Sequence, residues 1–196
     1  HYLVLAGAGS GKTRVLTHRI AWLNEVHGVP AHGILAVTFT NKAAGEMRAR
    51  ADVQLRNGSR GMWIGTFHGL AHRLLRLHWQ EAKLPEGFQV LDSDDQLRLV
   101  KRVAQQLELD DGRFPPRQIM WWINAQKDEG RRPQHIQPSG DEWGEVMLKS
   151  YALYQERCDN AGLVDFAEIL LRAHELLRDT PALLAHYRQR FGELLI

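Results

Sequence analysis

The sequence predicts an α/β protein whose parallel sheet is interrupted by a mostly α-helical insertion. Three short apolar runs separated by helical patterns indicate the strands, at residues 2–6, 34–39 and 62–66. Strand, helix, strand, helix, strand at this spacing is typical of a parallel sheet with crossover helices. From residue 67 to about residue 190 the periodicity is almost entirely helical.

Two helices are predicted between these strands. The first runs from Lys12 to Leu23 and carries its apolar residues on one side. The second runs from Asn41 to about Arg56. Asn41 is expected as its N-cap, because a short polar side chain there accepts a hydrogen bond from the first turn.

Local signals mark the helices of the insertion. Ser93 and Gln96 match a capping box, Gly162 is expected to close a long helix, and Asp165 is expected to cap the next one. The predicted helices begin at Phe67, Ser93, Pro115, Asp141, Asp165 and Thr180. A short strand is also expected at residues 88–91.

The domain limits follow from these segments. The strand-like run at residues 194–196 is expected to return to the sheet. We therefore predict a core formed by residues 1–66 plus 192–196 and an insertion formed by residues 67–191. Because both ends of the chain fall inside strand-like runs, we also expect a fragment of a longer protein.

The composition is that of an ordinary soluble globular protein, with 44% apolar and 24% charged residues. No apolar run approaches the ~18 residues that span a bilayer, and no signal peptide is evident, so no membrane partner is expected. A single cysteine, Cys158, excludes an internal disulfide and favours a cytoplasmic location. The net charge is only +2, but residues 42–78 hold seven basic and two acidic side chains. This stretch is either a groove for a polyanion or a set of solvated helix faces.

A glycine-rich loop between the first strand and the first helix matches a phosphate-binding (Walker A) loop. It consists of Ala6, Gly7, Ala8, Gly9, Ser10, Gly11, Lys12 and Thr13. Glycines let successive backbone N–H groups face one anion, and the helix N-terminus adds partial positive charge. Lys12 is expected to contact the β- and γ-phosphates and Thr13 to bind Mg²⁺, so these two are the candidate catalytic residues. Ala6 stands where the pattern usually has glycine.

The loop alone indicates binding of a nucleoside triphosphate and does not reveal how the energy is used. The alternative is a structural glycine turn. His68 and His72 have the spacing of a zinc pair, but no third ligand is evident, so no metal beyond Mg²⁺ is expected.

Four further segments carry a family resemblance. They are Thr38–Ala44 with its continuation to Arg50, Gly65–Gly69, Gln126–Gly130 and Ala161–Phe166. Together with the loop, and in this order, they resemble the UvrD, PcrA and Rep family of superfamily 1 DNA helicases over essentially the whole chain. The resemblance implies the first RecA-like, P-loop NTPase motor domain with its helical subdomain inserted.

The resemblance also implies an activity and its partners. It implies ATP-dependent unwinding of DNA with 3′ to 5′ movement along single-stranded DNA, in repair or replication. ATP and Mg²⁺ are the implied cofactors. Single-stranded DNA, junctions of single- and double-stranded DNA, and repair or replication proteins are the implied partners.

The resemblance places residues at two kinds of site. Arg14 is expected against the adenine, although an ordinary surface arginine is the alternative. The residues expected to contact DNA are Thr38, Phe39, Thr40, Asn41, Arg50, Thr66, Phe67, His68 and Phe166. Aromatic rings that stack on bases tolerate any sequence, as movement along a strand requires. Without the resemblance, Phe39 and Phe67 fit a core position better, and Phe166, which lies just inside a helix start, could pack inward in the same way.

Other aromatic and basic residues of the insertion have plainer interpretations. Helix packing is predicted for Trp121, Trp122 and Trp143. A solvated loop is predicted for Lys127, Arg131 and Arg132, with contact to duplex DNA as the alternative.

Three other functions stay open at this stage. They are the helicase part of a recombination helicase-nuclease, a nucleic-acid-binding module without catalysis, and a P-loop ATPase that does not act on nucleic acid. The family also places an Asp-Glu pair just after a run like Leu194–Ile196, and a second motor domain beyond it. The 196 residues alone are therefore expected not to hydrolyse ATP and to bind nucleotide weakly.

Overall fold

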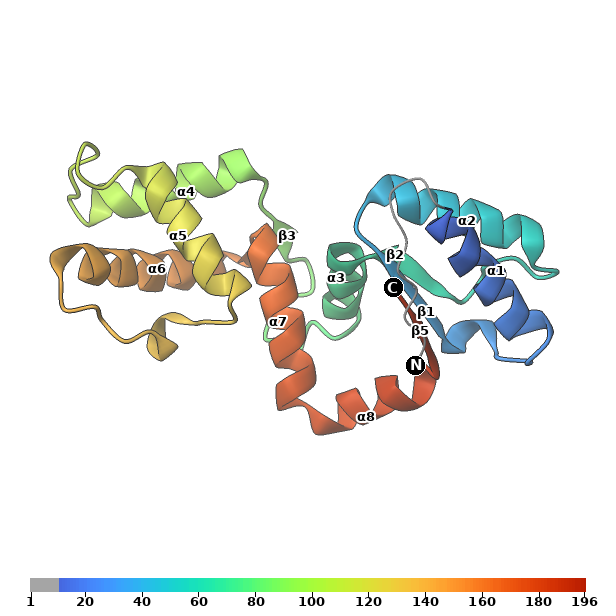
Figure 1. Ribbon diagram of the computed structural model, residues 1–196. Helices are drawn as coiled ribbons and strands as arrows, with labels where there is room; N and C mark the ends of the chain where they lie inside the picture. Colours follow the sequence, from blue (N-terminus) through green and yellow to red (C-terminus); the bar gives the residue numbers. More distant parts are fainter. Residues whose placement is uncertain (1–10) are drawn as a thin grey trace. The chain divides into compact units, whose positions relative to one another are not determined.

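The computed structural model describes residues 11–196 (Figure 1). The predicted strand at residues 2–6 and the loop residues Ala6 to Ser10 lie outside this range. The α-helices of the described part are α1 Lys12–Glu25, α2 Asn41–Gln54, α3 Phe67–Leu77, α4 Ser93–Gln106, α5 Pro116–Asp128, α6 Glu142–Ala161, α7 Phe166–Asp179 and α8 Pro181–Arg190. Its strands are β1 Ile34–Thr38, β2 Trp63–Thr66, β3 Gln89–Val90, β4 Leu163–Val164 and β5 Glu193–Leu195. Two short 3₁₀ helices are η1 Ala31–Gly33 and η2 Pro133–His135.

The chain divides into two compact units. Unit 1 contains the residues up to Leu70 and Thr180–Ile196, and unit 2 contains Ala71–Asp179. The predicted insertion was longer, because it included the start of α3 and all of α8. Helix α8 belongs with the sheet because Tyr187 is buried and its ring lies 5.6 Å from that of Trp63 on β2.

Unit 1 is built on a three-stranded parallel sheet with the order β2-β1-β5. In the register of β1 and β2, Thr38 pairs with Thr66. Helices α1 and α2 lie side by side (Figure 1), and both bury apolar side chains against the sheet. The mixed α/β class, the strands at residues 34–39 and 62–66, and the return of the last residues to the sheet are confirmed, with the strand limits shifted by about one residue.

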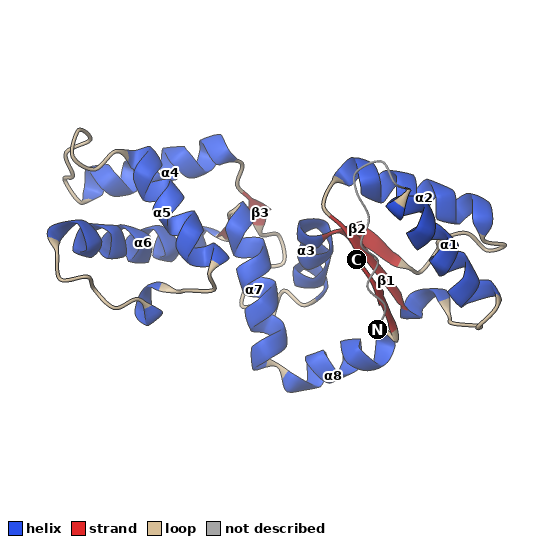
Figure 2. Ribbon diagram, viewed as in Figure 1, coloured by secondary structure: helices blue, strands red, loops and turns tan. Residues whose placement is uncertain are grey.

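Unit 2 is mainly helical, as the colours of Figure 2 show. Its core is formed by buried residues of α4, α5 and α6, including Val100, Ile119 and Tyr151. The predicted strand at residues 88–91 is present as β3, which pairs in parallel with β4. No helix within residues 11–196 is long and apolar enough to cross a membrane.

Two predicted helix caps are wrong by one position. Thr40, not Asn41, caps α2, and its hydroxyl accepts a hydrogen bond from the Ala43 N–H at 3.1 Å. Asp92, not Ser93, caps α4 in the same way, with the Asp95 N–H at 2.7 Å. In both cases two neighbouring residues are good caps, and the one with extended backbone dihedral angles takes the role.

The other predicted helix ends are confirmed. Helix α6 was predicted to begin at about Asp141, which is its N-cap, and Gly162 ends it with a left-handed φ of 64°. Asp165 caps α7 by accepting a hydrogen bond from the Glu168 N–H at 2.8 Å.

Of the three tryptophans predicted to pack helices, one does not. Trp122 packs against the core of unit 2, and Trp143 stacks on Phe114 with ring centroids 5.6 Å apart. Trp121 is exposed on α5, so the packing prediction is wrong for it. The sequence analysis predicted the same packing for Trp121 and Trp122, although adjacent residues of a helix point in different directions.

Candidate functional site

The described end of the glycine-rich loop leads directly into α1. Gly11 has a left-handed φ of 85°, and no atom of residues 11–196 other than its chain neighbours lies within 4 Å of where a Cβ would stand. Within the same residues no side chain caps α1, and its first turn contains no acidic residue. Lys12 is exposed and Thr13 is partly buried. A helix start of this kind, with N–H groups and a lysine but no carboxylate, suits a phosphate group.

Arg14 follows on the same turn of α1 and is also exposed. Its expected place against the adenine stays a prediction, as do the roles of Ala6, Gly7, Ala8, Gly9 and Ser10, which lie outside the described residues.

An aromatic pair lies where β1 and β2 end. Thr38 and Thr66 are paired in register, and each is followed at once by a phenylalanine. The rings of Phe39 and Phe67 have centroids 5.5 Å apart and planes inclined by 50°. Phe39 is 81% exposed and Phe67 is 38% exposed. The interpretation of these two residues as core residues is therefore wrong, and they form one open aromatic surface.

The hydroxyl groups beside this pair support the helices that follow the strands. The Thr40 hydroxyl accepts the Ala43 N–H, and the Thr66 hydroxyl accepts the Gly69 N–H at 3.1 Å. A hydroxyl that accepts still has its own hydrogen to donate. Both groups therefore fix the start of α2 and α3 and keep a donor beside the aromatic pair.

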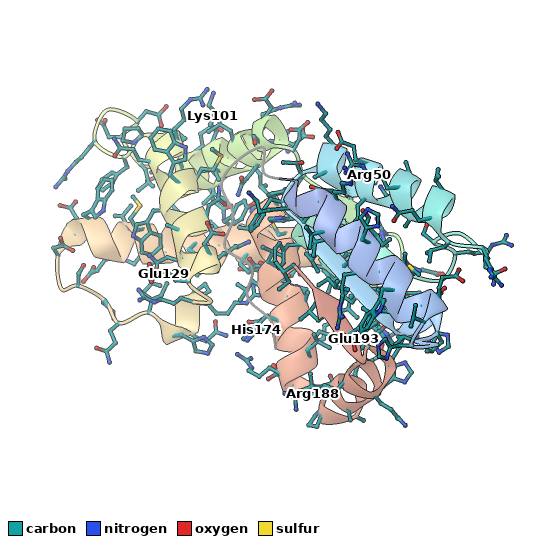
Figure 3. The ribbon with its side chains drawn as sticks, turned by 45° about the vertical axis from the view of Figure 1, so that its right-hand side comes forward. Arg50, Lys101, Glu129, His174, Arg188 and Glu193 are labelled. Atoms are coloured by element: carbon teal, nitrogen blue, oxygen red, sulfur yellow. The ribbon has the colours of Figure 1, made fainter. Side chains whose placement is uncertain are left out.

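The basic residues of the stretch at residues 42–78 are divided between the two units and have different partners. Arg48 donates to the Ile64 carbonyl oxygen at 3.3 Å, and Arg56 lies 3.5 Å from Glu25. Arg76 belongs to unit 2 and lies over the Phe88 ring, 3.8 Å from its centroid. Arg50 extends from α2 with an exposed side chain (Figure 3).

The two remaining predicted DNA contacts of unit 1 lie at helix starts. Asn41 is exposed as the first residue of α2, and His68 is partly buried as the second residue of α3. Both follow the strands that end at the aromatic pair, so the predicted contacts of unit 1 other than Arg50, which lies further along α2, gather at one edge of the sheet.

Phe166 is the first residue of α7 in unit 2 and is 60% exposed. The inward-packed alternative for it is therefore wrong. Its neighbour Asp165 is only 1% exposed. The segment Ala161–Phe166 thus joins a buried carboxylate to an exposed ring in consecutive positions.

Lys127 and Arg132 are buried, so neither a solvated loop nor a duplex contact describes them. The Lys127 side chain is 0% exposed, and its Nζ lies 2.6 Å from Asp165 Oδ2 and 2.9 Å from Glu168 Oε2. Arg132 donates to Glu168 at 2.8 Å and to Glu175 at 2.8 and 2.5 Å.

Two further groups complete this buried ion cluster. Arg172 donates from Nε to Glu168 Oε1 at 2.7 Å, and Tyr154 donates its hydroxyl to Asp165 Oδ2 at 2.8 Å. We call the set Tyr154, Lys127, Arg132, Asp165, Glu168, Arg172 and Glu175 the buried ion cluster. Arg131, by contrast, is exposed and lies 2.7 Å from the exposed carboxylate of Glu129, which fits the solvated-loop interpretation (Figure 3 labels Glu129).

The electrostatics of the cluster keep Lys127 and Glu168 charged. Burial raises the pKa of Glu168, but Lys127 and Arg132 outweigh it and lower the pKa to about 2. Burial likewise lowers the pKa of Lys127, but Glu168 and Asp165 outweigh it and raise the pKa to about 12. Desolvation raises the pKa of the Cys158 thiol to about 12, so this cysteine stays protonated.

The only sequence signal for this cluster was the charged segment Gln126–Gly130, whose composition also fits a loop. The carboxylate partners of Lys127 and Arg132 lie 36 to 43 residues further along the chain. Periodicity and capping rules act within a few residues and do not reveal such pairs.

Comparison with known proteins decides the family. The sequence model of the UvrD/REP helicase N-terminal domain matches residues 1–196. The chain belongs to this family. It is 60% identical over 194 residues to the DNA helicase II of Escherichia coli (strain K12), covering 99% of this chain and 27% of that protein. It is 38% identical over 190 residues to the ATP-dependent DNA helicase PcrA of Bacillus subtilis (strain 168), covering 96% of this chain and 26% of that protein.

The predicted family resemblance is thus confirmed. The chain spans about a quarter of the length of the curated relatives that it matches. Family membership gives a basis for interpreting two features of unit 1: the exposed aromatic pair at the strand ends and the start of α1.

Proposed function

We propose that this chain is the part of an ATP-driven DNA helicase that binds ATP and single-stranded DNA. The sheet of unit 1 is then a P-loop NTPase core of the RecA-like kind, and unit 2 is the helical subdomain inserted in it. The relatives named DNA helicase II and ATP-dependent DNA helicase PcrA support this function. Movement from 3′ to 5′, a role in repair or replication, a cytoplasmic location, and binding of single-to-double-strand junctions and of repair or replication proteins come from the same relationship.

One observation carries the proposal: Phe39 and Phe67 form an exposed aromatic pair at the end of two adjacent parallel strands. Ligands of open α/β sheets bind at this carboxyl edge. Large apolar side chains are costly to leave in water, and two adjacent exposed rings indicate a surface that a ligand covers. Unpaired bases have two apolar faces and fit such a surface.

The nucleotide would be held by the start of α1. The N–H groups near Gly11 would bind phosphate oxygens, and Lys12 would balance their negative charge. The Thr13 hydroxyl would hold Mg²⁺, which supplies charge stabilisation in phosphoryl transfer. Because Gly11 leaves open space where a side chain would stand, the backbone can approach the phosphates closely.

The test is the affinity of the complete gene product for an oligothymidine strand, with wild type compared with Phe39→Ala. Loss of one stacking ring is expected to weaken binding about fivefold or more, because stacking contributes roughly 1–3 kcal/mol per base. The control is Trp22→Ala, which removes a 40% exposed ring from the C-terminal half of α1. Equal affinities for wild type and Phe39→Ala would refute the proposed binding surface.

A further inference from the structure

We propose that the buried ion cluster of unit 2 positions Phe166 for contact with single-stranded DNA, with Lys127 and Asp165 as the positioning residues. The inference rests on the proposed function and adds to it residues that never touch the DNA. It gives a role to Lys127 of the charged segment Gln126–Gly130. It also gives a second role to Asp165, which the sequence predicted only as a helix cap.

The two oxygens of Asp165 have separate tasks. Oδ1 accepts the Glu168 N–H at 2.8 Å and so fixes the first turn of α7. Oδ2 accepts from Lys127 Nζ at 2.6 Å and from the Tyr154 hydroxyl at 2.8 Å. The carboxylate is therefore held from α5, α6 and α7 at once, and its rotation is fixed. Phe166 is the next residue, so the direction of its side chain follows from this arrangement.

A second set of contacts fixes the same turn from the other side. Glu168 Oε2 receives Lys127 and Arg132, while Oε1 receives Arg172 at 2.7 Å. The carboxylate is 1% exposed, so these bonds are made without competition from water. The first turn of α7 thus has two buried carboxylates, at Asp165 and Glu168, each bound to Lys127.

The chain that enters α7 is also constrained. Strand β4 pairs with β3, and the Leu91 N–H donates to the Val164 carbonyl oxygen at 2.9 Å. The result is an exposed ring at a helix start whose backbone is held on both sides. A rigid ring loses little conformational entropy when a base stacks on it, which favours binding.

Net stability alone does not account for such a cluster. Replacing buried ion pairs with apolar residues is often neutral or stabilising, whereas charged hydrogen bonds restrict geometry strongly. A cluster with two buried cations and a partly buried third one next to an exposed aromatic ring is thus better explained by positioning than by stability.

The experiment measures the affinity of the complete gene product for an oligothymidine strand over a salt series. Four proteins are compared in a cycle: wild type, Lys127→Met, Phe166→Ala and the double variant. Lys101→Met is the matched control, because it makes the same substitution at an exposed lysine of α4 (Figure 3). We expect Lys127→Met to weaken binding about three- to tenfold, with no further loss in the Phe166→Ala background.

The salt slope separates positioning from direct contact. Removing a lysine that contacts a phosphate lowers the slope of log affinity against log salt by about 1. Removing a buried positioning residue leaves this slope unchanged. An unchanged slope with a loss that depends on Phe166 supports the inference. A lower slope, or an equal loss in both backgrounds, overturns it.

Two controls keep the outcome decisive. If Lys127→Met does not fold, Tyr154→Phe removes one of the hydrogen bonds to Asp165 and keeps the buried ring, and its loss of affinity must also depend on Phe166. If Phe166→Ala alone leaves the affinity unchanged, the inference fails, whereas the proposed function is still judged by Phe39→Ala.

Discussion

The exposed aromatic residues of the two units are supported in different ways. In unit 1, Phe39 and Phe67 follow the paired ends of two strands. The hydroxyl groups of the adjacent Thr40 and Thr66 each accept a hydrogen bond from the backbone N–H three residues further on, at the start of the next helix. In unit 2, Phe166 follows a carboxylate that is held by Lys127 from 38 residues away. Backbone geometry supports the first site, and buried charge supports the second. The two should therefore respond differently to substitution, to pH and to backbone strain.

The largest expected effect separates chemistry from stability in unit 1. Lys12→Ala in the complete gene product should lower DNA-stimulated ATP hydrolysis by about 100-fold or more, because the charge on the phosphates is lost. Thermal unfolding should be unchanged, since Lys12 is exposed. A steady-state ATPase assay measures this, with Lys101→Ala as the control. A wild-type protein without ATPase activity would instead favour a binding module that lacks catalysis.

The second effect concerns the stability of unit 2. Glu168→Gln removes the carboxylate shared by Lys127, Arg132 and Arg172, so each of these cations loses one of its carboxylate partners. We expect a loss of about 3–5 kcal/mol in the free energy of unfolding. Chemical denaturation measures it. The exposed pair of Arg113 and Glu142 provides the control, because Glu142→Gln should cost less than about 1 kcal/mol. Similar losses for both variants would contradict the contrast between buried and exposed charge.

The third effect is a dependence on pH. The pKa of Glu168 is lowered from 4.5 to about 2, so its contribution to stability is fully present above pH 4.5 and is lost as the pH falls through 2. The pKa of Lys127 is raised from 10.5 to about 12, so its contribution is present below pH 10.5 and is lost as the pH rises through 12.

The corresponding measurement is the unfolding temperature of wild type and Glu168→Gln between pH 5 and pH 2. The difference in unfolding temperature between the two proteins should disappear as the pH falls. Protonation of Glu168 costs wild type up to about 3 kcal/mol of its free energy of unfolding, and the variant has no such carboxylate to protonate. A gap that stays constant down to pH 2 would show that Glu168 is not held ionised by its neighbours.

The smallest effect compares one glycine from each unit. Gly28 and Gly162 have φ values of 66° and 64°, but a Cβ meets no atom within 4 Å at Gly28 and lies 2.6 Å from Pro85 Cγ at Gly162. Gly28→Ala should cost about 1–2 kcal/mol for the left-handed backbone alone, and Gly162→Ala about 2–4 kcal/mol, because overpacking adds to it. Denaturation midpoints measure the difference. Equal costs would mean that Pro85 moves aside freely.

Much of the fold could be predicted because its signals are local. Strand β1 is a short apolar run, and Gly162 and Asp165 have the chemistry of helix ends. The caps Thr40 and Asp92 were missed by one residue, because Asn41 and Ser93 beside them are equally good caps by residue type. Local chemistry therefore finds a helix start to within a residue but does not choose between adjacent caps.

The rest of the site depends on which distant segments meet. Sequence patterns alone favoured a core position for Phe39, and only the family resemblance favoured an exposed one. The charged segment around Lys127 predicts a solvated side chain, although folding places its Nζ 2.6 Å from a carboxylate 38 residues away. Sequence rules judge whether a charge is buried from neighbours within a few positions, and the carboxylate partners of Lys127 and Arg132 in the buried ion cluster lie 36 to 43 residues away.

The central claim is that the aromatic edge of unit 1 holds the strand along which an ATP-driven motor moves. The most direct measurement is ATP-driven unwinding of a duplex with a 3′ single-stranded tail by the complete gene product and by its Phe39→Ala/Phe67→Ala variant. The account predicts a wild type that unwinds the duplex and a variant that folds and binds ATP equally well but unwinds at least about tenfold more slowly. Unwinding at the wild-type rate by the folded variant would contradict it.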